Sequence, residues 1–131
     1  MEKKILLEKY NKNYTEEQFY KDNVVYAFSE EQLQKAMQKL GVHDKNQLTT
    51  FGYGSICLKS KVNDILSWIA EKKTEKANWL KSLTRAEQKI IIAHELYNYE
   101  CTYTGDIEIV VELFNGIFEK SLIVSVWDEI K

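Results

Sequence analysis

Apolar residues occur in short strand-like runs in the first half of the chain and at helical spacing in the second half. Residues 24–28 form a short run rich in β-branched and aromatic side chains, which predicts a strand. Two further apolar runs lie within 48–59, on either side of Gly52-Tyr53-Gly54, and predict a hairpin with glycines at its turn. The expected fold class is therefore α+β, with a small antiparallel sheet packed against several helices.

Helices are expected where apolar residues recur at three- and four-residue intervals and where capping signals precede them. Capping-box patterns begin at Thr15, Ser29 and Thr84. Gly41 is placed to end the helix that Ser29 begins. The expected helices cover 2–22, 29–40, 61–82, 84–100 and 104–114. The β-branched segment 121–127 fits a strand as well as a helix.

Length and composition favour one folded domain over the whole of 1–131, with 1–22 as a helical N-terminal arm. The chain is 44% hydrophobic and 12% aromatic, which excludes general disorder. No apolar run approaches the ~20 residues that span a bilayer. We therefore expect a cytoplasmic protein with no membrane partner and no cofactor. Its two cysteines, Cys57 and Cys101, are expected to be reduced core residues.

The sharpest polar feature lies on the helix predicted at 84–100. His94, Glu95 and Asn98 share one face of that helix and interrupt apolar residues. Glu100 and Asp106 could add carboxylates to this polar cluster. A buried carboxylate is unfavourable without partners, so the cluster needs an explanation. One interpretation is a structural network bonded to backbone groups of the hairpin or of the Thr104–Gly105 turn.

Two alternative interpretations make the polar cluster a metal site. A zincin helix needs a second histidine four residues after the first, and that position is Asn98. A hard-metal site from Glu95, Glu100 and Asp106 has suitable oxygen ligands. We predict no metal and no catalytic residues. A small ligand-binding or hydrolytic domain centred on His94, Glu95, Asn98 and Asp106 stays an alternative.

The glycine-rich turn around Tyr53 lacks the lysine and the following helix of a phosphate-binding loop. A plain hairpin turn is expected, with Tyr53 exposed at its tip and able to anchor a partner.

Charge is divided along the chain. Residues 59–89 carry eight basic and four acidic side chains, whereas 95–131 carry two basic and eight acidic ones. The basic stretch could bind RNA or DNA, with lysines on phosphates and tryptophans stacking on bases. The acidic stretch could meet a basic groove of another protein. The candidate binding residues are Lys72, Lys73, Lys76, Lys81, Arg85, Glu108 and Glu112.

A family resemblance covers roughly 23–115. Three features carry it: the segment 26–32, the Gly52-Tyr53-Gly54 turn, and the polar residues from Glu95 to Asp106. In these features the chain resembles small accessory proteins of phages and mobile elements in low-GC bacteria. The resemblance implies a factor in host–phage conflict that acts by binding, as anti-CRISPR proteins do.

The function expected from the sequence is therefore a non-enzymatic accessory protein that binds and inhibits a host defence nucleoprotein. The partner would be a host protein or ribonucleoprotein. Direct nucleic-acid binding through the 59–89 region is the first alternative, and the small ligand-binding or hydrolytic domain is the second. The sequence does not indicate an oligomeric state.

Overall fold

A computed structural model describes residues 1–131 and has an α+β fold with one three-stranded sheet. The chain forms two compact units, each described by itself. Unit 1 consists of Met1–Lys12 and Thr74–Lys131, and unit 2 of Asn13–Lys73. None of the helices is both long enough and apolar enough to cross a membrane.

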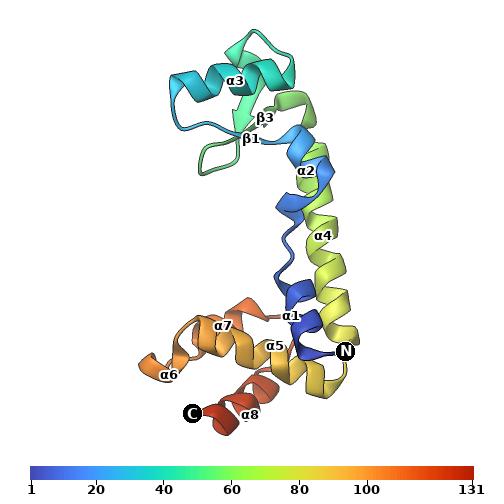
Figure 1. The fold of residues 1–131 in the computed structure, drawn as a ribbon, viewed down its shortest axis with the longest axis vertical. Helices are drawn as coiled ribbons and strands as arrows, with labels where there is room; N and C mark the ends of the chain where they lie inside the picture. Colours follow the sequence, from blue (N-terminus) through green and yellow to red (C-terminus); the bar gives the residue numbers. More distant parts are fainter. The chain divides into compact units, whose positions relative to one another are not determined.

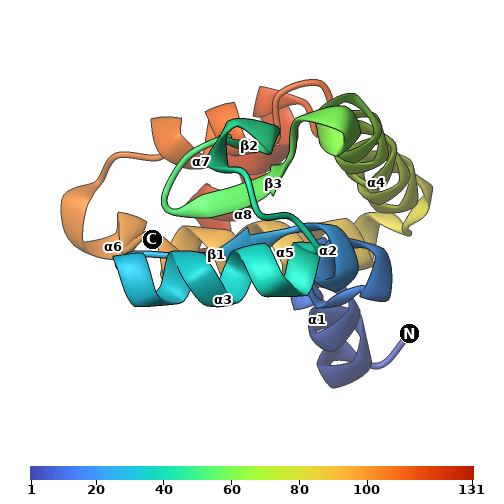
Figure 2. The ribbon, with the colours of Figure 1, turned by 90° about the horizontal axis from the view of Figure 1, so that it is seen from above.

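Unit 2 contains the sheet. Its strands run antiparallel in the order β1-β3-β2, with Val25 opposite Ile56 and Thr49 opposite Cys57. Helix α3 contacts β1 and β3 and lies along the sheet (Figures 1 and 2). The elements of this unit are η1 (Tyr14–Glu16), α2 (Gln18–Asn23), β1 (Val25–Tyr26), α3 (Glu30–Leu40), η2 (Lys45–Gln47), β2 (Leu48–Thr50), β3 (Ser55–Leu58), η3 (Lys59–Lys61) and the first part of α4 (Val62–Ser82).

The strand predicted at 24–28 is shorter in the structure and covers only Val25–Tyr26. The predicted hairpin is present as β2 and β3. A small core holds unit 2 together, built from Tyr20, Val24, Cys57 and Ile65. Trp68 packs against this core and contacts the rings of Tyr14, Phe19 and Tyr20.

Unit 1 is helical. Helix α5 is its centre and contacts α1, α6, α7 and α8; Figure 1 shows α8 beside α5. The core includes Leu6 of α1, Leu80 of α4, Ile91 of α5, Phe114 at the end of α7 and Ile123 of α8. The elements of this unit are α1 (Lys3–Asn11), the last part of α4, α5 (Arg85–Asn98), α6 (Cys101–Thr104), α7 (Glu108–Leu113) and α8 (Lys120–Ile130).

The three capping-box predictions have different outcomes. Thr84 and Glu87 form the complete box. At Ser29 half of the box forms, since the Ser29 side chain accepts a hydrogen bond from the backbone N–H of Gln32. The Gln32 side chain accepts from the backbone N–H of Phe28 and not from that of Ser29. The prediction at Thr15 is wrong, because Asn13 caps a short 3₁₀ turn there and α2 begins without a side-chain cap.

The segment 121–127, which fitted a strand or a helix, lies within helix α8. Leu122, Ile123 and Val126 are buried, at the three- and four-residue spacing of a helix face. The predicted N-terminal arm 1–22 is divided between the units: Met1–Lys12 belongs to unit 1, with Leu6 and Tyr10 in its core, whereas the rest belongs to unit 2, with Tyr20 in its core. Both cysteines are free and buried, Cys57 in unit 2 and Cys101 in unit 1. Burial raises the pKa of each thiol.

Candidate functional site

The polar cluster on α5 centres on a buried carboxylate. Glu95 is 7% exposed. The hydroxyl of Tyr10 donates a hydrogen bond to its Oε2 at 3.0 Å, and Nδ2 of Asn98 donates to its Oε1 at 3.3 Å. His94 Nε2 lies 3.9 Å from the same Oε1. Both carboxylate oxygens are therefore satisfied by side chains of unit 1, which offsets the cost of burying the charge.

Tyr10 extends this cluster onto α1 and α4. The ammonium of Lys76 lies over its ring, 4.4 Å from the centroid, and His94 meets the ring edge-on. Burial raises the pKa of Tyr10, and the negative charge of Glu95 raises it further. Burial also lowers the pKa of Lys76, an effect that Glu95 opposes. The cluster thus combines a carboxylate, a phenol and an ammonium that stabilise one another.

Two predicted members do not join the cluster. Asp106 accepts a hydrogen bond from the backbone N–H of Glu108 at 2.9 Å. Glu100 is exposed, with a positive φ of 56° at the start of α6. The predicted bonds from the cluster to backbone groups of the hairpin or of the Thr104–Gly105 turn are also wrong, because Glu95 is held by Tyr10 and Asn98. No group of three or more metal-binding side chains is close enough to hold an ion.

Unit 2 exposes a group of aromatic side chains near the hairpin turn. Tyr53 is 97% exposed and Phe28 is 74% exposed. Tyr26 on β1 and Phe51 before the turn are exposed to a lesser degree. We call these four residues the aromatic turn. Of the four, sequence reasoning singled out only Tyr53.

Backbone contacts tie the two halves of the aromatic turn together. Tyr26 is paired with Ser55, and the N–H of Ala27 donates to the carbonyl of Gly54 at 2.9 Å. The ring of Phe28 lies directly over Gly54, so closely that an added Cβ would be 2.5 Å from its Cε1. The absence of a side chain at position 54 therefore makes room for the Phe28 ring.

The backbone at the tip is strained. Tyr53 has a φ of 51°, in the left-handed region that costs a non-glycine residue roughly 1–2 kcal/mol. Hydrogen bonds hold the turn in this shape: the N–H of Ser55 donates to the carbonyl of Gly52 at 3.0 Å, and the N–H of Gly52 donates to Oγ1 of Thr50 at 3.2 Å. A nearly fully exposed tyrosine is thus presented on a fixed, strained backbone.

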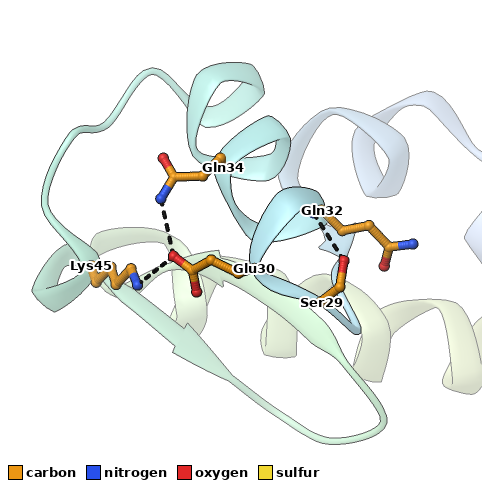
Figure 3. A network of polar contacts seen from close by, with 5 residues as sticks. All are labelled: Ser29, Glu30, Gln32, Gln34 and Lys45. Atoms are coloured by element: carbon orange, nitrogen blue, oxygen red, sulfur yellow. Dashed lines mark hydrogen bonds and ion pairs between the residues drawn. The ribbon is translucent and has the colours of Figure 1, made fainter.

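Charged groups at the start of α3, which follows Phe28 in the chain, are neutralised locally (Figure 3). Lys45 pairs with Glu30 at 2.8 Å, and Gln34 donates to the same Oε1 at 3.2 Å. Both hydrogen bonds lower the pKa of the Glu30 carboxyl, and the bond from Lys45 has the larger effect. In the same turn of α3, Oε1 of Gln32 accepts a hydrogen bond from the backbone N–H of Phe28 at 2.7 Å. The Phe28 backbone is therefore held by the side chain of Gln32.

The predicted basic residues are divided between the units. In unit 2, Lys72 pairs with Glu17 at 2.8 Å and lies over the ring of Trp68, whereas Lys73 is exposed. In unit 1, Lys76 belongs to the polar cluster, and Lys81 and Arg85 are exposed. The structure therefore uses two of the five basic candidates for internal contacts.

Both tryptophans of the basic stretch are also engaged. Trp68 packs against the unit 2 core, and Trp79 packs against the unit 1 core beneath the ammonium of Lys9. Base stacking would require these rings to leave those contacts. The acidic candidates lie on α7, where Glu108 pairs with Lys120 at 3.2 Å and Glu112 is exposed.

Sequence reasoning missed Tyr10, Tyr26, Phe28 and Phe51. For Tyr26 and Phe28 a signal was present, since alternate residues of the predicted strand 24–28 point to the same face and Val25, next to Tyr26, is buried. For Tyr10 no local signal exists, because its partner Glu95 is remote in sequence.

Comparison with known protein families gives a match over most of the chain. A protein-family model, described as a family of unknown function, matches residues 7–126. No curated protein and no solved structure matches the chain.

Proposed function

The chain belongs to the family of unknown function DUF7659, and we propose that it is a non-enzymatic binding protein that captures a second protein through its aromatic turn. The observation that carries this proposal is Tyr53, which is 97% exposed on a left-handed backbone. A strained residue persists only where the surrounding structure holds it, and such residues concentrate at functional positions. Here the strain serves to display an aromatic ring.

The aromatic turn has the properties of an interface anchor. Tyrosine and other large aromatics carry much of the binding energy at protein interfaces, where they fill pockets on the partner. A rigid anchor loses little conformational entropy on binding. Phe28 meets that condition, since its ring lies over Gly54 and its backbone N–H is bonded to Gln32.

Charge favours a protein as the occupant rather than nucleic acid. Unit 2 carries eight lysines and eight carboxylates, so it has no net charge. Nucleic-acid binding depends on net neutralisation of phosphates and falls steeply as salt rises. Recognition by an aromatic surface in a neutral unit depends mainly on apolar burial, and we expect it to change little with salt.

Three arguments support binding over catalysis. The most distinctive titratable group, Glu95, is buried with both oxygens bonded. Both cysteines are buried in cores. The aromatic turn contains no acid, base or nucleophile other than phenol. The proposed partner is a protein component of a host defence nucleoprotein in the bacterial cytoplasm, inhibited by being bound, which is the class implied by the resemblance to phage accessory proteins.

Site-specific photocrosslinking tests the proposal. The full chain carries a benzophenone amino acid at position 53, or at position 103 as a matched control, and is irradiated in a nuclease-treated lysate of a low-GC bacterium. Tyr103 is a suitable control because it is 91% exposed and lies in unit 1. We expect a defined protein adduct from position 53 and none from position 103.

The crosslinked protein is then purified and titrated with unmodified chain. Tyr53→Ser should weaken its affinity at least about tenfold, because truncating an interface anchor costs about 2 kcal/mol or more, whereas Tyr103→Ser should leave it unchanged. Affinity at about 50 and about 500 mM salt should differ little. Equal adducts from both positions, an adduct with a second copy of the chain, or binding that survives Tyr53→Ser would contradict the proposal. An adduct formed only without nuclease would indicate a nucleic-acid partner instead.

A further inference from the structure

We propose that a groove in unit 1, formed by α1, α5 and α8, binds a small amphipathic carboxylate. This inference concerns a different unit from the aromatic turn and does not depend on it. The groove has a volume of about 350 Å³. That volume falls at the lower end of the range for small-molecule pockets, roughly 300–1,000 Å³. A ligand of about ten non-hydrogen atoms fits such a space.

The walls of the groove are mainly apolar. Leu7 comes from α1, Ile90 and Ala93 from α5, and Val126 and Ile130 from α8. Because α1 and α8 both pack on α5 in unit 1, these side chains form apolar walls that suit a short alkyl or aryl group. Burying such a group removes apolar surface of both ligand and protein from water.

The charged groups that line the groove do not balance one another. Lys89 and Glu129 face each other with Nζ and Oε1 3.0 Å apart, so they neutralise one another. Lys3 also lines the groove, and none of the ion pairs of unit 1 includes it. His94 supplies an imidazole, with its Nε2 3.9 Å from the Glu95 carboxylate. The charge left without a counterion is therefore positive, at Lys3.

An apolar trough with one unpaired ammonium matches a ligand with an apolar body and a single negative charge. A carboxylate is the simplest such group, because lysine binds it through a charge-assisted hydrogen bond. His94 can donate a further hydrogen bond through a ring N–H. Lys3 would thus select the charge of the ligand, and the apolar walls would provide most of the contact area.

The test uses NMR titration of the full isotope-labelled chain with three probes of equal length: sodium octanoate, neutral octanamide and octylammonium. We expect saturable shifts of amide signals on α1, α5 and α8 with octanoate, weaker binding of octanamide and the weakest binding of octylammonium. Lys3→Gln should reduce octanoate affinity at least about threefold and abolish the preference over octanamide. Lys4→Gln, the same change at the next lysine, which does not line the groove, should leave both unchanged.

Steric filling gives a second measurement. Ala93→Leu should narrow the groove and weaken all three probes, while Tyr53→Ser in unit 2 should leave octanoate binding intact. The inference is overturned if no probe shifts these signals, if the three probes bind equally, or if Lys3→Gln and Lys4→Gln behave alike. Tyr53→Ser tests protein binding by the aromatic turn, and Lys3→Gln tests ligand binding by the groove. Failure of either proposal therefore leaves the other intact.

Discussion

The hydroxyl of Tyr10 donates a hydrogen bond to the buried carboxylate of Glu95 at 3.0 Å, and the two residues are 85 positions apart in the sequence. This contact joins α1 to α5. Tyr10→Phe keeps the ring, and with it the contact with Lys76, but removes one donor from a buried charge. We expect the free energy of unfolding to fall by about 1–3 kcal/mol, measured by guanidinium denaturation.

Tyr103→Phe serves as the control, since that hydroxyl is exposed and its loss should change stability by less than about 0.5 kcal/mol. A double-mutant cycle with Glu95→Gln separates the hydrogen bond from other effects. If Tyr10→Phe and Glu95→Gln were additive, the contact would contribute no coupling energy and the interpretation of Glu95 as a residue held by Tyr10 would be wrong.

Glu87 is expected to make the stability of unit 1 depend on pH in the acid range. The backbone N–H of Thr84, the ammonium of Met1 and the Thr84 hydroxyl all lower the pKa of this carboxyl. A carboxyl with a lowered pKa in the folded state stabilises the fold above its ordinary pKa of about 4.3, and this contribution is lost as pH falls through the lower value. Wild type should therefore exceed Glu87→Gln in melting temperature at about pH 7, and the difference should shrink below about pH 4.

The control for this series is Glu112→Gln, the same change at an exposed carboxylate of α7. Its difference from wild type should show no comparable decline. A difference between wild type and Glu87→Gln that stays constant from about pH 7 to about pH 3 would exclude the proposed electrostatic origin, since glutamine can still accept the Thr84 N–H in a capping box and the variant differs mainly in charge.

Tyr53 is expected to lower the stability of the fold while it strengthens binding to the partner. Asparagine tolerates a left-handed backbone better than tyrosine does. Tyr53→Asn should therefore raise the free energy of unfolding by up to about 1 kcal/mol while weakening capture of the protein partner. Paired denaturation and affinity measurements check both parts. A variant that is less stable than wild type would show that the exposed ring contributes to folding, contrary to its role as a displayed anchor.

Gly54 controls the position of the Phe28 ring. An alanine there would place its Cβ 2.5 Å from Cε1 of Phe28, in addition to the cost of a side chain at a φ of 76°. Gly41 offers a matched control in the same unit, with a φ of 75° and open space around it. Gly41→Ala should lose roughly 1–2 kcal/mol through backbone strain alone.

Gly54→Ala should lose a similar amount and, in addition, shift the NMR signals of the Phe28 ring and weaken partner binding. If the two glycine variants bound the partner equally well, the placement of Phe28 over Gly54 would have no role in recognition. The comparison is informative because the two positions share their backbone conformation and differ in their neighbours.

Features set by neighbouring residues could be predicted from the sequence. The capping box of Thr84 and Glu87 depends on residues three apart, and it forms as expected. The pattern at Thr15 looked equivalent, but Asn13, two residues earlier, accepts the Thr15 N–H and caps the turn first. Two candidate caps two residues apart are difficult to rank from sequence.

Features set by packing could not be predicted. The β-branched run at 121–127 has strand propensity, yet it is helical because Leu122, Ile123 and Val126 are buried together in the unit 1 core. Tertiary burial outweighs the small propensity differences between these residues. The same limit applies to the site: Glu95 was identified as needing a partner, but nothing near it in sequence indicates Tyr10.

The two buried cysteines provide one chemical reporter for each unit. A thiol reacts with an alkylating reagent as its thiolate and only when it is accessible, and neither Cys57 nor Cys101 has any exposed surface. Alkylation of either residue therefore requires a local or global opening of its own core. Mass spectrometry of the intact chain, followed by peptide mapping, would time the opening of each unit in the wild-type protein, without any label or substitution.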